Sequence, residues 1–178
     1  MKFTKMHGIG NDYVYINGFE QTVEDPAALS IQIADRHFGV GGDGLIMILP
    51  PAPGIDAHVR IRMFNADGSE AEMCGNGIRC VAKYAHDHGL TDARPMKVQT
   101  GNGVLSIDFT TDAAGKLETA TVDMGEPILT PADVPVDVTK LSGTDQPHTF
   151  QVAMPETGYA GPALLDRKST RLNSSHYS

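Results

Sequence analysis

The sequence contains no tryptophan and only two cysteines, Cys74 and Cys80, among its 178 residues. Two cysteines are too few for the disulfide framework on which small secreted domains depend. No apolar run approaches the roughly 20 residues that a membrane-spanning helix needs. The first residues, MKFTKMHGIGND, also lack the apolar core of a signal peptide. These absences predict a cytoplasmic protein with no membrane partner, in a compartment that would keep both cysteines as thiols.

Positive charge is also scarce. The chain has 14 Lys and Arg residues against 22 Asp and Glu residues, which gives a formal net charge of -8. A nucleic-acid partner would require a basic surface, so this balance argues against one. A small anionic substrate remains compatible with it, because the field at a site depends on nearby groups more than on the total charge.

Two patterns that would indicate a cofactor or a metal are incomplete. The segment GVGGDG at residues 39–44 has the glycine spacing of a dinucleotide-binding loop, but that loop follows a strand and precedes a helix. Here a predicted helix precedes it and a predicted strand follows, so we interpret it as a turn. Cys74 and Cys80 are farther apart than paired zinc ligands usually are. His86 and His88 would point to nearly opposite sides of one helix, so we expect no metal site.

Short strands and two helices alternate along most of the chain. Apolar patterns predict strands at residues 13–16, 45–49, 58–64, 70–73, 97–100, 104–109 and 117–124. The Asp-Pro pair at residues 25–26 is typical of a helix start, and that helix should run to about residue 36. A second helix is predicted over residues 76–88, with Asn76 as its cap and Gly89 closing it. Apolar residues cover most of its circumference, so we expect an α+β domain whose sheet curls around this buried helix.

The segment MCGNG at residues 73–77 carries the most chemical information. Cys74 lies between a predicted strand and the N-terminus of the second helix, where unpaired N–H groups and the helix dipole favour negative charge. A thiol at such a position is expected to be reactive. Gly75 and Gly77 would let a ligand approach the backbone closely. Taken alone, the segment is compatible with an anion site beside a nucleophile or base, or with an inert buried cysteine at a tight turn. Cys80, inside the helix, is interpreted as a packing residue.

Five segments in order resemble the diaminopimelate epimerase family. They are MHGIGNDY at residues 6–13, RHFGVGGDG at 36–44, FNADGSE at 64–70, MCGNG with the following Arg79-Cys80 pair, and VDMGEP at 122–127. The resemblance covers residues 1 to about 140 and fades beyond them.

The resemblance implies a two-domain enzyme with pseudo-twofold related halves, each a curved, mostly antiparallel sheet wrapped around a central helix. It implies conversion of LL- to meso-diaminopimelate, a precursor of lysine and peptidoglycan, with neither pyridoxal phosphate nor a metal as cofactor. One thiolate and one thiol, one from each half, would remove and return the α-proton on opposite faces. Cys74 matches the first of the two catalytic cysteines. Four residues match substrate-binding positions: Asn11, Asn65, Gly75 and Asn76.

The sequence departs from the family pattern at several places. Gly44 stands where many members carry a substrate-contacting glutamine, and no counterpart of the second catalytic cysteine is present. We therefore predict a first epimerase domain at residues 1–117, an incomplete second domain at 118–166, and a non-native or disordered tail at 167–178. A homodimer is implied for the full-length protein, and this fragment alone is expected to be inactive. Two alternatives stay open: another amino-acid racemase or isomerase of the same fold, and a non-catalytic module that binds carboxylates.

Overall fold

The computed structural model describes residues 1–126, 129–130, 142–143, 149–154 and 159–164. The chain divides into two compact units, Met1–Met124 and Gly125–Ser178. The first unit contains the candidate site. The second unit contains a three-stranded antiparallel sheet with the order β11-β10-β9. Its strands are β9 (Ser142–Gly143), β10 (Thr149–Met154) and β11 (Tyr159–Leu164). The predicted boundaries at residues 117 and 166 concern the complete protein and stay predictions, and the predicted tail lies outside the described residues.

The first unit is built on an eight-stranded sheet with the order β1-β2-β3-β4-β6-β7-β8, and β5 pairs with β4 beside this path. The strands are β1 (Thr4–Gly8), β2 (Asn11–Asn17), β3 (Gly44–Leu49), β4 (Val59–Asn65), β5 (Glu70–Ala71), β6 (Met96–Thr100), β7 (Gly103–Thr111) and β8 (Leu117–Val122). Neighbours pair antiparallel except for β2 with β3 and β4 with β6, which are parallel. The predicted α+β class with a mostly antiparallel sheet is confirmed.

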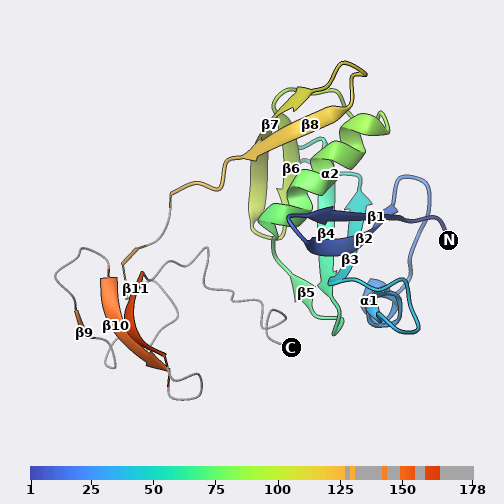
Figure 1. Cartoon of the computed structure of the whole chain (residues 1–178). Helices are drawn as coiled ribbons and strands as arrows, with labels where there is room; N and C mark the ends of the chain where they lie inside the picture. The colour runs from blue at the N-terminus through green and yellow to red at the C-terminus, as the bar shows by residue number, and fades with distance from the viewer. Residues whose placement is uncertain (127–128, 131–141, 144–148, 155–158, 165–178) are drawn as a thin grey trace. The chain divides into compact units, whose positions relative to one another are not determined.

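Helix α2 (Gly75–Asp87) lies inside the curl of this sheet (Figure 1). It contacts β1 at one end of the strand order and β8 at the other, as well as β2, β4 and β6 between them. A helix can reach both ends of a sheet only if the sheet bends around it. Its inward side chains, among them Ile78 and Val81, are fully buried. The predicted buried helix is therefore confirmed.

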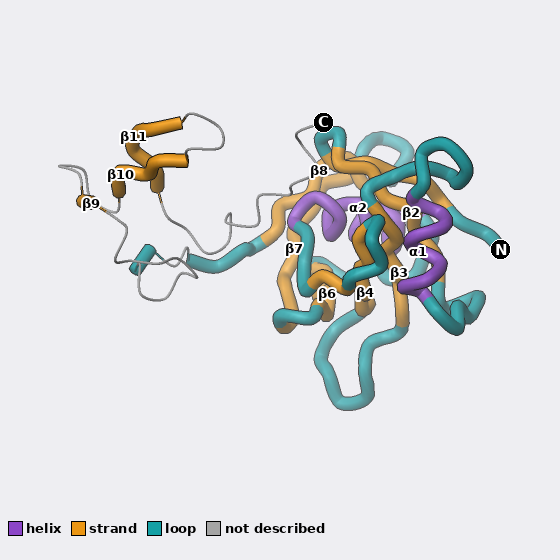
Figure 2. Tube along the Cα trace, turned by 90° about the horizontal axis from the view of Figure 1, so that it is seen from below, coloured by secondary structure: helices purple, strands orange, loops and turns teal. Residues whose placement is uncertain are grey.

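The central strands are buried on both faces, and alternate residues along them enter different apolar clusters. On β2, Tyr13 and Tyr15 belong to the cluster around α2, whereas Val14 and Ile16 belong to the cluster around α1 (Pro26–Ala34). This division follows from the two-residue period of a strand. The two helices thus cover different faces of the sheet, and both views of the chain show them apart (Figure 2).

Several element boundaries differ from the sequence predictions. Strand β1 was not predicted, and β5 is shorter than the predicted strand at residues 70–73. Asp25 caps α1 as predicted, because its Oδ1 accepts the N–H of Ala28 at 3.0 Å, but the helix ends at Ala34. The prediction that Asn76 caps α2 is wrong. The helix begins at Gly75 and the capping residue is Cys74.

Candidate active site

Cys74 occupies the N-cap position of α2. Its backbone is extended, with φ -140° and ψ 115°, and its Sγ accepts the N–H of Gly77 at 3.4 Å. The carbonyl of Cys74 accepts the N–H of Ile78 at 2.9 Å. A sulfur atom therefore takes the place that the side-chain oxygen of Ser, Thr, Asp or Asn usually fills at a helix start. The half-buried thiol remains directly beside the first turn of the helix.

The first two N–H groups of α2 have no acceptor within residues 1–126. Gly77 and Ile78 donate to Cys74, whereas no described group accepts from the backbone of Gly75 or Asn76. Such unpaired N–H groups at a helix N-terminus, together with the helix dipole, attract a carboxylate or another anion. The side chain of Asn76 is directed elsewhere, because its Oδ1 accepts a hydrogen bond from Nη2 of Arg79.

A tight hairpin between β1 and β2 brings Asn11 to the thiol. Gly8 pairs with Asn11, and the two residues between them have positive φ, 55° at Ile9 and 85° at Gly10. Positive φ at both central residues is typical of the two-residue turns that connect the strands of a hairpin. Asn11 is only 6% exposed, and its Oδ1 lies 3.3 Å from Sγ of Cys74. The sequence prediction placed these two residues in one site, and they are in direct contact.

Close backbone packing fixes the hairpin against the helix. A Cβ atom on Gly8 would lie 2.9 Å from the carbonyl oxygen of Asn76, and one on Gly77 would lie 2.7 Å from Cδ1 of Ile46. Neither distance is compatible with a larger side chain unless the neighbour moves. The two glycines thus let α2 start directly beside the hairpin and the central strands.

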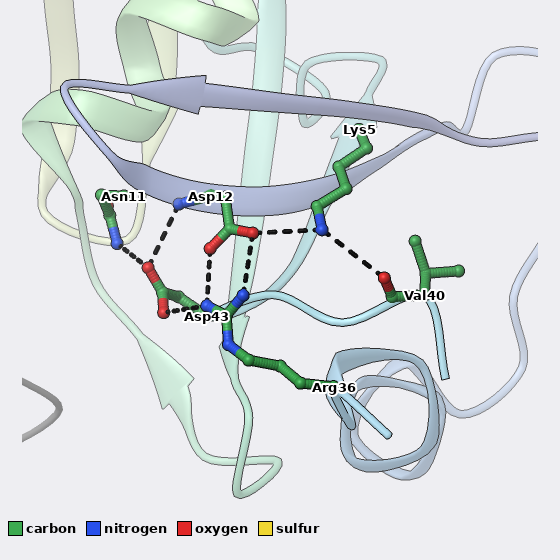
Figure 3. A network of polar contacts seen from close by, with 6 residues as sticks. All are labelled: Lys5, Asn11, Asp12, Arg36, Val40 and Asp43. Carbon is green, nitrogen blue, oxygen red and sulfur yellow. Dashed lines mark hydrogen bonds and ion pairs between the residues drawn. The ribbon is translucent and has the colours of Figure 1, made fainter. Parts of the chain in front are cut away.

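Asp43 connects the hairpin to the loop that precedes β3 (Figure 3). Its Oδ2 accepts from Nδ2 of Asn11 at 2.5 Å and from the N–H of Asp12 at 3.1 Å. Its own N–H donates to the carbonyl of Asp12 at 2.6 Å. Two segments that are about 30 residues apart in the sequence are therefore held together by three hydrogen bonds.

Two cations complete this network. Arg36 donates to both carboxylate oxygens of Asp12, at 2.7 and 3.1 Å, and to Oδ1 of Asp43 at 3.0 Å. Lys5 lies 3.2 Å from Asp12. The bonded Arg36 guanidinium lowers the pKa of the Asp12 carboxyl, and Lys5 adds to this effect. The segments that contain Asp12, Arg36 and Asp43 carry the family resemblance, but their sequence predicts no individual role for these three residues.

Of the two remaining predicted site residues, Gly75 lies at the start of α2 and Asn65 lies at the end of β4. Asn65, at the end of β4, donates through Nδ2 to Oγ of Ser69 at 2.9 Å, and so belongs to the turn before β5. A Cβ on Gly75 would meet only the Met124 side chain, at 3.8 and 3.9 Å, so its backbone can be approached closely. The structure brings Asn11, Cys74, Gly75 and Asn76 together at the start of α2, whereas the Asn65 side chain bonds within its own turn.

Gly44 occupies a position that a glutamine could not adopt with this backbone. Its φ is 152°, and a Cβ would lie 2.0 Å from the carbonyl oxygen of Phe64 on the neighbouring strand. The departure from the family pattern is therefore linked to the local path of the chain, in which β3 and β4 approach closely at Gly44 and Asn65.

Two neighbouring side chains of the core, the Tyr13 hydroxyl and the Cys80 thiol, have raised pKa values. Burial raises the pKa of Tyr13 to about 12, and the nearby Cys74 and Asp43 add to the shift. Burial also raises the pKa of the Cys80 thiol, which is 8% exposed inside α2. Cys80 is thus a core residue, as the sequence predicted.

Among the described residues, no group of three or more His, Cys, Asp and Glu side chains is arranged to hold a metal ion. No described helix is long and apolar enough to cross a membrane.

The family assignment rests on the sequence. Residues 3–130 match the family model described as diaminopimelate epimerase. The chain belongs to the diaminopimelate epimerase family. It is 59% identical over 136 residues to the diaminopimelate epimerase of Agathobacter rectalis, a match that covers 76% of this chain and 46% of that protein. It is 54% identical over 155 residues to the enzyme of Desulfovibrio desulfuricans, covering 87% of this chain and 52% of that protein. The chain thus spans about half the length of these epimerases.

Solved structures of more distant proteins share the fold. A hydroxyproline epimerase from Agrobacterium vitis, with bound trans-4-hydroxy-L-proline, has a TM-score of 0.56 at 14% identity and covers 92% of this chain and 47% of its own. A methylitaconate-delta-isomerase has a TM-score of 0.53 at 19% identity and covers 65% and 35%. These likenesses confirm the predicted fold of this chain.

Proposed function

We propose that this chain provides the Cys74 half of a diaminopimelate epimerase, which interconverts LL- and meso-diaminopimelate by proton transfer between cysteines. The observation that carries the proposal is the placement of the Cys74 thiol beside the first two N–H groups of α2, for which no described residue is an acceptor. The family and its epimerase relatives support the choice of reaction and substrate. The product would supply lysine and peptidoglycan synthesis.

The geometry suits removal or return of an α-proton of an amino acid. That proton is a very weak acid, and its loss spreads negative charge onto the substrate carboxylate. A carboxylate bound by the N–H groups of Gly75 and Asn76 would be stabilised more strongly as this charge develops. Cys74 is the residue that caps the same helix, so its sulfur would lie on one face of the adjoining α-carbon. No step requires a metal or an organic cofactor.

The remaining predicted ligands have different support. Asn11 contacts Cys74 directly, so we propose that it acts at the reacting end of the substrate. The bond to Ser69 uses one N–H of the Asn65 amide, and the contact of this amide with the substrate stays a prediction. The full set of ligands, the cytoplasmic location and the homodimer of the complete protein stay predictions.

A second thiol is required on the opposite face of the α-carbon. The 178 residues contain one other cysteine, Cys80, and it is buried in the same helix. Cys80 lies six positions after Cys74, which is about 9 Å along a helix axis at about 1.5 Å per residue. Cys80 therefore cannot face Cys74 across a bound substrate. We propose that the second thiol belongs to the part of the complete epimerase that the relatives have and this chain does not match.

The experiment is a chimera in which the matched segment of the Desulfovibrio desulfuricans epimerase is replaced by the corresponding segment of this chain. Incubation with LL-diaminopimelate, followed by chiral chromatography, should show formation of the meso isomer. The Cys74→Ala chimera should lose at least about a hundredfold in rate, because general acid–base groups contribute at least that much. The 178-residue chain alone should be inactive.

The Cys80→Ala chimera is the matched control and should remain active. Turnover by the Cys74→Ala chimera would contradict the proposed role of this thiol. An inactive chimera that still binds diaminopimelate in calorimetry would instead favour a carboxylate-binding module, the second class considered from the sequence.

A further inference from the structure

The side-chain amide of Asn11 links a carboxylate to a thiol. Its Nδ2 lies 2.5 Å from Oδ2 of Asp43, and its Oδ1 lies 3.3 Å from Sγ of Cys74. With 6% of Asn11 exposed, the amide is nearly enclosed by protein. Both of its ends therefore bond to protein groups, one in the loop before β3 and the other at the start of α2.

The chemistry of these two partners determines which way the amide points. A carboxylate only accepts hydrogen bonds, so the group that faces Asp43 is the NH₂ of Asn11. The amide oxygen is left to face Cys74, and that oxygen also only accepts. The contact between Asn11 and Cys74 consequently requires a proton on the sulfur. A rotated amide would direct its NH₂ at the sulfur and would favour the thiolate instead.

Asp43 is well held in the acceptor role. Its Oδ1 accepts from Nη2 of Arg36 at 3.0 Å, and its Oδ2 also accepts from the N–H of Asp12 at 3.1 Å. Arg36 is anchored in turn by two bonds to Asp12 (Figure 3). Rotation of the carboxylate would break bonds to an arginine and to a backbone donor, so its orientation is set independently of Asn11.

We propose that Asp43 is a positioning residue that orients the Asn11 amide and thereby holds Cys74 as a thiol with its proton directed at Asn11 Oδ1. For turnover this rests on the proposed function: the second cysteine of the complete enzyme, as a thiolate, would take the α-proton and so break that C–H bond, and Cys74 would donate its proton to the opposite face. When the proton passes from Sγ to the α-carbon, the S–H bond breaks, a C–H bond forms and a thiolate remains. The N–H of Gly77 already points at that sulfur.

Three other acidic side chains interact with Cys74, and all three are buried. Tyr13 and Tyr15 on β2 and Cys80 on α2 interact electrostatically with Cys74, and burial raises the pKa of all three. Asp43 interacts with Tyr13 of the same cluster and contacts the guanidinium of Arg36. A change in the pH dependence of Cys74 upon mutation of Asp43 therefore reports on Asp43 and Asn11.

The test measures the rate of iodoacetamide alkylation of Cys74 between pH 6 and pH 10, by peptide mass mapping of the full 178-residue chain. Asp43→Ala should lower the midpoint of the pH profile by about one unit, because the freed amide can donate to the sulfur. Asp43→Asn removes the same charge but keeps an oxygen that can accept from Asn11 Nδ2, so its shift should be smaller. In an Asn11→Ala background, Asp43→Ala should produce only the small shift caused by the lost charge.

Equal shifts for Asp43→Ala with and without Asn11 would overturn the proposal, as would equal shifts for Asp43→Ala and Asp43→Asn. Far-UV circular dichroism tests whether each variant is folded. If Asp43→Ala is not, Asn11→Ala alone decides, because it leaves Asp43 bonded to Arg36 and Asp12. Its midpoint must then fall, since the acceptor of the thiol proton is lost, and an unchanged midpoint would refute the link. The readout needs no turnover, so its failure is distinct from failure of the chimera to epimerise.

Discussion

The thiol of Cys74 and the amide of Asn11 meet although 63 positions separate them in the sequence. The sequence could single out Cys74, because a cysteine before a glycine-rich helix start has a local electrostatic meaning. It could not show that Asp43 orients Asn11. That contact arises from the pairing of β2 with β3, and neither segment contains a local pattern that specifies it.

The capping prediction failed for a related reason. Asn76 is a residue type that commonly caps helices, whereas cysteine is not, so composition favoured the wrong residue. The backbone of Cys74 is extended and its sulfur reaches the N–H of Gly77, which makes Cys74 the first residue before the helix. A site residue thus has a structural role that propensity alone does not predict.

The Asp12 carboxylate should make the stability of the fold sensitive to acid. Its pKa is lowered in the folded protein, chiefly by Arg36, so its stabilisation is present above the unfolded value of about 3.9 and is lost as the pH falls through the folded value. Urea denaturation should show wild type losing more free energy of unfolding below about pH 4 than Asp12→Asn does. The variant should be about 1 kcal/mol less stable at pH 7.

Asp108→Asn is the matched control, because Asp108 is an exposed carboxylate on β7. Its curve of unfolding free energy against pH should follow that of wild type. Parallel curves for wild type and Asp12→Asn would show that the network with Arg36 contributes no pH-dependent stability.

Elements with one clear periodic signal were predicted from the sequence, and elements without one were not. Strand β4 alternates buried Val59, Ile61 and Met63 with half-buried arginines, which is the pattern read from the sequence. Strand β1 pairs only with β2 at the edge of the sheet, and none of its residues is fully buried. An edge strand needs few apolar residues, so its sequence carries little periodic signal.

The packing of α2 predicts a contrast between two identical substitutions. Ile78 on α2 is fully buried, whereas Ile31 on α1 is 53% exposed. Ile78→Ala should lower the free energy of unfolding by about 3 kcal/mol, through lost burial and the cavity left behind. Ile31→Ala should change it by less than about 1 kcal/mol, because most of this side chain is already in water. Equal effects in urea denaturation would show that α2 does not form the core of the unit.

At the scale of the whole molecule, both apolar clusters formed by the described residues lie within the first compact unit. Every buried residue of both clusters falls between Tyr13 and Leu117. Composition and pattern could predict this α+β unit, because its strands and central helix have strong local signals. The relationship of the unit to the rest of an epimerase could be inferred only from family resemblance, since about half of each relative lies outside the match.

A chain of residues 1–126 should therefore fold on its own. It retains the complete eight-stranded sheet, both helices and both apolar clusters. Thermal unfolding followed by circular dichroism should show one cooperative transition, as expected for a single domain of this size. The full 178-residue chain is the control and should show a transition at a similar temperature. A shorter chain that lacks a cooperative transition would show that residues beyond 126 complete the core.

The central claim is that Cys74, at the start of α2, is the reactive thiol of this chain. Limiting iodoacetamide applied to the folded protein, followed by peptide mass mapping, compares both cysteines in one molecule. Cys74 should be labelled first, because it is half-buried beside the helix N-terminus, whereas burial raises the pKa of Cys80. Both thiols should react at similar rates in urea. Preferential labelling of Cys80 in the folded chain would contradict the account.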